Sequence, residues 1–210
     1  MNAKNTVILP ISDPQALLLS QEYVQAGKLI VFPTDTLYGL ACDPSNPAAL
    51  RSIYAAKGRS TLKALPVLIG ALEQLDQLVE NIPPNAQRLM ERFWPGALTL
   101  VLPKQANLPS ELTPYPGLAV RMPNHPFALE LLQALGPLAV TSANLADQIN
   151  PQTAQEVWAQ LASRVDLILD GGHLEIGQAS TIIDCTGAEP MLLRAGPIAF
   201  DAILQTWQGD

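Results

Sequence analysis

The sequence predicts an α/β fold in a single domain. Short apolar runs, typical of buried strands, alternate with amphipathic segments along the 210 residues. Hydrophobic residues make up 48% of the chain and charged residues 15%, which is enough apolar material for a well-buried core. No repeat, low-complexity tract or flexible linker interrupts the pattern. Residues 1–210 are therefore expected to form one domain.

The first helix is expected to follow Asp13-Pro14. Ser12 or Asp13 can cap its start, Pro14 suits a first helical position, and Gly27 can close it. Residues 29–32 are then almost continuously apolar, which is the pattern of a strand buried on both faces. A buried strand is therefore expected directly after the first helix.

Later elements continue the alternation. A second helix is predicted over residues 47–57, where Asn46 can cap the start and Gly58 can adopt the left-handed conformation at the end. Thr153 and Glu156 have the spacing of a capping box, which predicts another helix start. The remaining expected elements are strands at 65–69, 98–102, 118–122, 138–141, 166–169, 181–183 and 191–193, and helices at 72–79, 84–93 and 126–135.

The composition argues against several classes of protein. The formal charge is −7, whereas a broad surface for nucleic-acid phosphates needs clustered Lys and Arg. No apolar run approaches the length of a membrane-spanning helix, and no signal-peptide or transit pattern opens the chain, so a cytoplasmic protein is expected. Cys42 and Cys185 lack any CxxC or paired-His spacing, so both are expected to be buried apolar residues.

Cations are concentrated in one segment of this acidic chain. Arg51, Lys57, Arg59 and Lys63 fall within thirteen residues. The helix dipole favours cations at the expected helix end in any case, which explains Lys57 and Arg59 but not Lys63. Three cations around Gly58 suit a loop that wraps a polyphosphate, with lysine as a point charge and arginine as a bidentate fork. The chain has no P-loop sequence.

Polar side chains also follow the strand expected at residues 29–32. Thr34, Asp35, Thr36 and Tyr38 bring two hydroxyls, a carboxylate and a phenol. We expect them to converge at the carboxyl end of the strand, where open α/β sheets place ligands. A Thr/Asp turn that satisfies its own backbone is the alternative.

Two arginines and a second polar motif add to this pattern. Thr141-Ser142-Ala143-Asn144 ends the strand expected at 138–141. Arg121 lies inside an apolar strand, so its charge must be exposed on one face or paired with an anion. Arg194 follows another apolar strand. A surface ion pair is the alternative for each arginine.

Seven motifs, in this order, resemble those of the YrdC-type threonylcarbamoyl-AMP synthases. Any one of them is weak alone, but seven in order across about residues 29–197 are specific. The motifs are Pro33-Thr34-Asp35-Thr36-Leu37-Tyr38-Gly39-Leu40, Lys57-Gly58-Arg59, Phe93-Trp94-Pro95-Gly96-Ala97-Leu98-Thr99, Val120-Arg121-Met122-Pro123, Thr141-Ser142-Ala143-Asn144, Ser180-Thr181-Ile182-Ile183-Asp184 and Arg194-Ala195-Gly196.

The resemblance implies a twisted mixed sheet flanked by helices, with a concave, positively lined cleft, in the short form of the family. It also implies a nucleotidyltransferase that joins L-threonine, bicarbonate and ATP into threonylcarbamoyl-AMP and releases pyrophosphate, with Mg²⁺ on the ATP phosphates. The product would feed a downstream transferase that forms threonylcarbamoyladenosine in tRNA. A carbamate oxygen attacks the α-phosphorus, so the protein needs to position and neutralise charge and needs no nucleophile of its own.

The resemblance also assigns residues. Those expected to bind ATP are Lys57, Arg59, Lys63, Ser142, Asn144 and Arg194, with Lys57 and Arg59 also catalytic. Those expected to bind threonine or the adjacent adenylate are Thr36, Arg121, Thr141, Ser180 and Thr181. No protein ligand for the metal is expected, and Lys57 and Arg59 are expected to be solvated. Leu68 stands where some members have a threonine-site histidine, which puts that contact in doubt, and Ala64 and Ala97 replace frequent prolines.

The alternative is an RNA- or nucleotide-binding module of the same fold without this activity. The charge of −7 argues against it, because binding RNA at physiological salt requires many cationic contacts to phosphates. At most weak direct RNA binding, and no membrane binding, is therefore expected.

Overall fold

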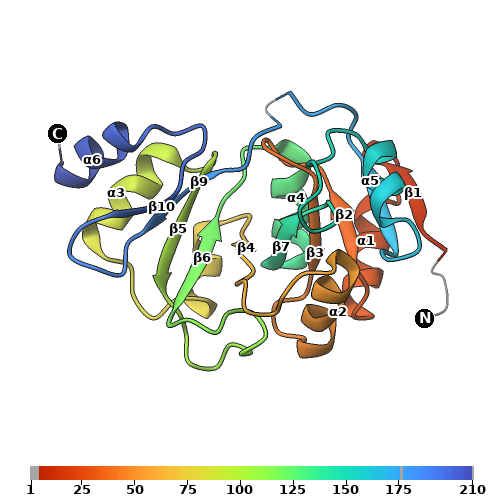
Figure 1. The fold of residues 1–210 in the computed structure, drawn as a ribbon, viewed down its shortest axis with the longest axis horizontal. Helices are drawn as coiled ribbons and strands as arrows, with labels where there is room; N and C mark the ends of the chain where they lie inside the picture. The colour runs from red at the N-terminus through yellow and green to blue at the C-terminus, as the bar shows by residue number, and fades with distance from the viewer. Residues whose placement is uncertain (1–4, 176, 210) are drawn as a thin grey trace.

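The computed structural model describes residues 5–175 and 177–209 and contains one ten-stranded sheet with parallel and antiparallel pairs (Figure 1). The strand order is β1-β8-β2-β3-β7-β4-β6-β5-β9-β10. The strands are β1 (Val7–Pro10), β2 (Ile30–Phe32), β3 (Gly39–Cys42), β4 (Val67–Leu68), β5 (Leu98–Pro103), β6 (Gly117–Arg121), β7 (Leu138–Ser142), β8 (Leu167–Asp170), β9 (Thr181–Asp184) and β10 (Met191–Arg194). The predicted α/β fold with a mixed sheet is confirmed.

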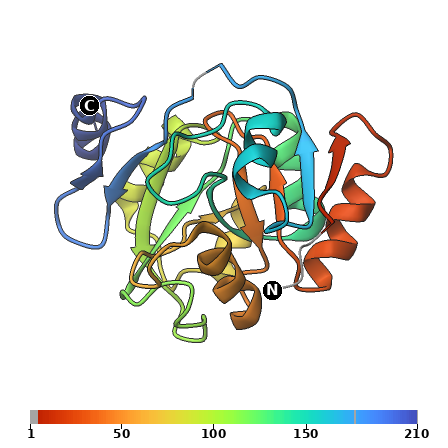
Figure 2. The ribbon, with the colours of Figure 1, turned by 45° about the vertical axis from the view of Figure 1, so that its right-hand side comes forward.

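Helices cover both faces of this sheet. They are α1 (Ala16–Gln25), α2 (Pro47–Lys57), the 3-10 helix η1 (Leu72–Gln77), α3 (Pro84–Phe93), α4 (Pro126–Leu135), α5 (Ala154–Leu161) and α6 (Phe200–Gln208). Helix α1 packs beside α4 and α3 beside α6, while α2 and α5 both lie in front of the strands in Figure 2. Within residues 5–175 and 177–209, no helix is long and apolar enough to span a membrane.

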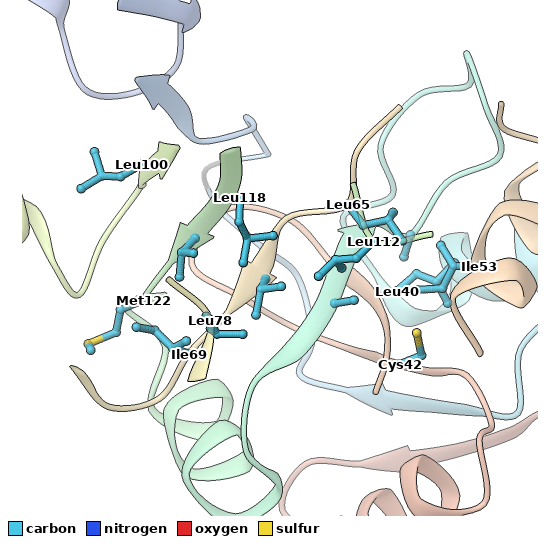
Figure 3. Close-up of a cluster of buried hydrophobic side chains, with 14 of the residues drawn as sticks. Leu40, Cys42, Ile53, Leu65, Ile69, Leu78, Leu100, Leu112, Leu118 and Met122 are labelled. Carbon is cyan, nitrogen blue, oxygen red and sulfur yellow. The ribbon is translucent and has the colours of Figure 1, made fainter. Parts of the chain in front are cut away.

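The core is divided between the two faces of the sheet because side chains along a strand alternate. In β2, Ile30 and Phe32 join the cluster that α1 and α4 cover, and Val31 joins the cluster on the opposite face. Figure 3 shows part of this second cluster, in which Leu40 of β3 lies near Ile53 of α2. All three β2 residues are buried, as the continuous apolar run predicts.

The second helix is confirmed with both of its predicted ends. The Asn46 side chain accepts two backbone N–H bonds at the start of α2, and Gly58 ends the helix in the left-handed conformation with a φ of 63°. The first helix begins later than predicted, at Ala16. Asp13 instead accepts the N–H of Gln15 in the turn that precedes the helix.

Other local predictions hold in part. Thr153 caps α5 as predicted, but the Glu156 carboxylate accepts the N–H of Gln152, so the capping box is not closed. Residues 72–77 form a 3-10 helix where an α-helix is expected. Both cysteines are free and buried, as expected.

Strands β1 and β3 and helix α6 were not predicted from the sequence. Strand β3 begins directly after the polar motif and runs antiparallel to β2 and β7. Its first residue, Gly39, allows close packing on β7, because a Cβ there would lie 2.6 Å from Cγ1 of Val140. Since β3 turns back beside β2, the connecting residues 33–38 form a tight turn at the end of both strands.

Candidate active site

A cavity of about 650 Å³ is lined by the turn after β2, the segment after α2 and residues of strands β4, β5, β6, β7, β9 and β10. These segments are distant in sequence and are brought together by the strand order. Seven of the eleven residues predicted to bind ATP or threonine line it: Thr36, Arg59, Arg121, Thr141, Ser142, Ser180 and Arg194. The predicted residues therefore do gather, for the most part, in one place.

Arg121 is the most buried cation of the cavity wall, with 5% of its surface exposed. Its guanidinium forms an ion pair with Asp35, donates from Nη1 to the Thr36 hydroxyl at 2.7 Å and donates from Nε to the Gly96 carbonyl at 2.8 Å. Burial lowers the pKa of Arg121, and the Asp35 carboxylate opposes that shift. Of the two options that the sequence left open for this arginine, pairing with an anion is the correct one.

The turn after β2 divides its polar groups between two tasks. The Thr34 hydroxyl accepts the N–H groups of Thr36 and Leu37 at 3.2 and 3.1 Å, so for Thr34 the self-satisfied turn is confirmed. Asp35 and Thr36 instead contact Arg121. The Thr34 and Thr36 hydroxyls also lie 3.1 Å apart, and both residues line the cavity, so the expected convergence holds for both hydroxyls and the carboxylate.

The phenol of Tyr38 does not join them, which corrects the sequence prediction. Its hydroxyl donates to the Gly172 carbonyl at 2.7 Å and accepts the N–H of Gly171 at 3.1 Å, in the segment that follows β8. Burial raises the pKa of Tyr38 to about 12. Tyr38 thus ties two loops together and stays protonated at neutral pH.

Arg59 directly follows Gly58, the residue that ends α2, and its side chain lines the cavity. Its Nη1 donates to the Thr141 hydroxyl at 2.9 Å and its Nη2 to the Ala64 carbonyl at 3.3 Å. Its buried Nε finds no hydrogen-bond partner among the described residues. Burial lowers the pKa of Arg59. A guanidinium held by neutral groups retains its full charge for an anionic ligand.

Arg194 completes a group of three guanidinium ions. Its Nε donates to the Ser180 carbonyl at 2.9 Å and its Nη2 to the Ser180 hydroxyl at 3.1 Å. Burial is the main cause that lowers the pKa of Arg194, and the neighbouring charge of Arg59 lowers it further. The charge of Arg194 in turn lowers the pKa of Arg121. The three like charges are therefore close enough to repel one another, and an anion bound between them would relieve this repulsion.

Lys57 is not solvated, contrary to the prediction. Its side chain is 3% exposed, and its ammonium donates to oxygens of Ser142 and Asn144. Burial, and to a smaller extent the neighbouring charge of Arg59, lowers the pKa of Lys57 to about 7. A lysine at a helix end is usually exposed, but here the segment after β7 covers it. Among the described residues, Lys57 and Asn144 thus lie behind the cavity wall and not in its lining.

The other two predicted residues outside the lining differ from each other. Lys63 is exposed on the loop after α2. Thr181 is fully buried, and its hydroxyl donates to the Ile198 carbonyl at 2.8 Å and accepts the Ile198 N–H at 3.0 Å. Thr181 therefore anchors the segment that follows β10.

Some residues that line the cavity had no predicted role in the site. Thr99 is 2% exposed and shares a hydrogen bond of 2.7 Å with the Ser180 hydroxyl. A polar residue between Leu98 and Leu100 is a signal that could have identified it. Tyr115 and Asp184 also line the cavity. Asp184 ends one of the seven motifs, whereas no local pattern distinguishes Tyr115.

A family of known proteins matches most of the chain, including the seven motifs found in its sequence. The family model Sua5_yciO_yrdC, described as telomere recombination, matches residues 22–196. The chain belongs to this family. The match covers nearly all of the predicted range of about 29–197, and the resemblance read from the seven motifs is confirmed.

Family members with assigned names are similar over most of the chain. The threonylcarbamoyl-AMP synthase of Pyrococcus abyssi is 40% identical over 183 residues, which are 86% of this chain and 54% of that protein. The enzyme of the same name from Bacillus subtilis is 40% identical over 201 residues, which are 93% of this chain and 57% of that protein. The chain thus spans little more than half the length of these two relatives.

A solved family structure shares the fold. The crystal structure of P. abyssi Sua5 complexed with L-threonine has a TM-score of 0.91 and 36% identity. The similarity covers 97% of this chain and 61% of that one. The overall fold described above is therefore shared with that structure.

Proposed function

We propose that this chain is an L-threonylcarbamoyladenylate synthase, a nucleotidyltransferase that makes threonylcarbamoyl-AMP and pyrophosphate from L-threonine, bicarbonate and ATP. The observation that carries this assignment is the convergence of Arg59, Arg121 and Arg194 with the hydroxyls of Thr141 and Ser180 on one cavity. Relatives at 40% identity bear the name threonylcarbamoyl-AMP synthase, which supports it.

The chemistry requires positioning and charge neutralisation. The threonine amine and bicarbonate give a carbamate and water, and a carbamate oxygen then attacks the α-phosphorus as pyrophosphate leaves. Arg59, Arg194 and Ser142 are the proposed contacts to the phosphates. Arg121 is the proposed partner of the threonine carboxylate. Fixed guanidinium and hydroxyl groups stabilise the charge that develops on phosphate oxygens without any covalent step on the protein.

Mg²⁺ is proposed to accompany ATP. In the described part of the chain, no group of three or more His, Cys, Asp or Glu side chains could hold a metal ion. The donors at the cavity fit a cation held mainly by phosphate oxygens and water. The Asp184 carboxylate also lies on the wall, where its Oδ1 accepts two hydrogen bonds from Thr186. Bound in this way, Mg²⁺ would neutralise phosphate charge and favour the departure of pyrophosphate.

The product is an activated acyl-adenylate, so a downstream transferase must consume it. We propose that this transferase carries the threonylcarbamoyl group to tRNA and that the chain works in the cytoplasm with it. Direct binding of tRNA is not needed for this role, and the net charge of −7 disfavours it.

Pyrophosphate release with one substrate omitted at a time tests the function. We expect release only when L-threonine, bicarbonate and ATP are all present, because the attacking carbamate does not form otherwise. Equal release without threonine or without bicarbonate would refute the assignment. No turnover, combined with tight tRNA binding at about 0.15 M salt, would favour the RNA-binding module instead.

A further inference from the structure

All three N–H donors of the Lys57 ammonium form hydrogen bonds to oxygens of the protein itself. Its Nζ donates to the Ser142 carbonyl at 2.5 Å, to the Asn144 carbonyl at 2.7 Å and to Asn144 Oδ1 at 3.0 Å. A lysine ammonium has three donors, so these bonds use all of them. With 3% of the residue exposed, a phosphate oxygen could bind Lys57 only by displacing one of these partners.

The acceptors belong to residues 142–148, which begin at the last residue of β7 and which we call the β7 turn. The Ser142 hydroxyl donates to Asn144 Oδ1 at 2.6 Å within this turn. The Ala146 N–H donates to the Lys57 carbonyl at 2.9 Å. Lys57 thus contacts the β7 turn through its side chain and its backbone, while Ser142 of the same turn lines the cavity.

The conformation of the β7 turn depends on a cation at this point. Two carbonyls and one side-chain oxygen converge on Nζ, and their dipoles would repel one another if Nζ were absent. Buried acceptors without a donor are destabilising, because they have lost their hydrogen bonds to water and gained none in return. Without the Lys57 ammonium, the β7 turn would therefore rearrange toward water, and Ser142 would move with it.

We propose that Lys57 is a positioning residue, whose ammonium holds the β7 turn and thereby keeps Ser142 in place at the wall of a cavity that binds a phosphate-bearing ligand. The identity of this ligand rests on the proposed function, whereas the hold on the turn does not. Two neighbouring cations then have different tasks, because Lys57 supports the wall from behind and Arg59 lies in it.

Hydrogen exchange of backbone amides in the ligand-free protein tests the hold on the β7 turn. Lys57→Met keeps the side-chain length and removes every donor, and Lys28→Met, at a lysine over the Tyr23 ring, is the matched control. The measurement is made about one pH unit below the Lys57 pKa of about 7, where the ammonium is charged.

We expect amides 143–148 to exchange about ten- to a hundredfold faster in Lys57→Met and at the wild-type rate in Lys28→Met. Strands β5 and β6 should keep their wild-type exchange in both variants. Unchanged exchange of the β7 turn in Lys57→Met overturns the proposal. Acceleration spread over the whole sheet also overturns it, because Lys57 would then support the fold in general.

Coupling to Ser142 distinguishes positioning from a direct phosphate contact. Pyrophosphate release is measured for Lys57→Met, Ser142→Ala and the double variant. If Lys57 acts through Ser142, the double variant should be within about twofold of Ser142→Ala. Losses that multiply would instead assign Lys57 its own ligand contact and overturn the proposal.

A misfolded variant or an inactive wild-type protein would each leave at least one of these measurements decisive. If Lys57→Met does not fold, Lys57→Gln, which retains one donor group, replaces it in both measurements. If the wild-type chain releases no pyrophosphate, the proposed function fails, and the exchange of the β7 turn still decides whether Lys57 holds it.

Discussion

Arg121 on β6 forms an ion pair with Asp35, which lies 86 positions earlier in the turn between β2 and β3. Their side chains are only 6% and 12% exposed. The same guanidinium binds the Thr36 hydroxyl and the Gly96 carbonyl. One arginine therefore fixes two separate loops at the cavity wall, and the geometry of the site depends on this pair.

Removal of Asp35 should destabilise the protein strongly. In Asp35→Ala, the buried guanidinium of Arg121 loses its counter-ion, and breaking a buried pair from one side costs about 3 kcal/mol or more. We expect a loss of this size in the free energy of unfolding, measured by urea denaturation at neutral pH.

An exposed ion pair provides the control. Glu111→Ala removes the partner of Arg51, whose side chain is 59% exposed, and solvent screening leaves such exposed pairs with little effect on stability. Equal losses in Asp35→Ala and Glu111→Ala would show that the Arg121 pair is not effectively buried.

Arg59 should contribute directly to ATP binding. In Arg59→Met the loss of one charge-assisted contact reduces the binding free energy by about 1.5 to 3 kcal/mol, which raises the dissociation constant for ATP roughly ten- to a hundredfold. Arg51→Met removes an exposed arginine from helix α2, eight residues before Arg59, and should change affinity by less than about twofold. Calorimetric titration with ATP measures both, and wild-type affinity in Arg59→Met would exclude the contact.

The buried position of Lys57 predicts a pH dependence of stability. Its pKa falls from the ordinary 10.5 to about 7 on folding. Between these values the unfolded chain binds more protons than the folded one, so the free energy of unfolding rises with pH by up to about 1.4 kcal/mol per pH unit. The same stability is lost as the pH falls from 10.5 toward 7.

Comparison with Lys57→Met isolates this contribution. The methionine does not titrate, so other groups that titrate in this range cancel in the difference between the two proteins. We expect the wild-type protein to gain stability relative to Lys57→Met as the pH rises. A difference that stays constant with pH would show that Lys57 has the same pKa folded and unfolded.

Local signals explain most of the fold that the sequence could predict. Helix α2 was predicted with both ends because Asn46 and Gly58 act on backbone groups within four residues. Strand β1 could not be predicted in this way, since its four residues end in Pro10 and, within the part of the chain that the structure describes, pair only with β8, far along the chain. Long-range pairing of short strands leaves no periodic pattern.

The same distinction applies to the site. Arg121 was conspicuous because a charge inside an apolar strand requires a partner. The burial of Lys57 was not predictable, because its acceptors lie 85 and 87 positions away and the local sequence shows only a helix end. Thr181 stands in a motif beside Ser180, yet the alternation of strand β9 turns its hydroxyl toward Ile198.

The choice of amino-acid substrate should depend on hydroxyl groups of the cavity wall. The hydroxyls of Thr36, Thr141 and Ser180 each accept a bond from an arginine, so each orients its own hydrogen away from that arginine. Ser180 also shares a bond with Thr99, whereas the Thr141 hydroxyl lines the cavity and can donate to the hydroxyl of a bound threonine. We therefore expect Thr141 to distinguish threonine from valine.

Specificity constants for threonine, serine and valine test this expectation under saturating ATP and bicarbonate. Serine retains the hydroxyl and lacks one methyl group, worth about 1 to 3 kcal/mol in a pocket, so it should be about ten- to a hundredfold worse than threonine. Valine should be worse than serine, because it leaves the Thr141 donor unpaired in a buried site. Thr141→Val should narrow the gap between threonine and valine, while Thr181→Val, whose native hydroxyl binds Ile198, should not. If wild-type protein uses valine as well as serine, the pocket selects by shape, and Thr141 does not bind the substrate hydroxyl.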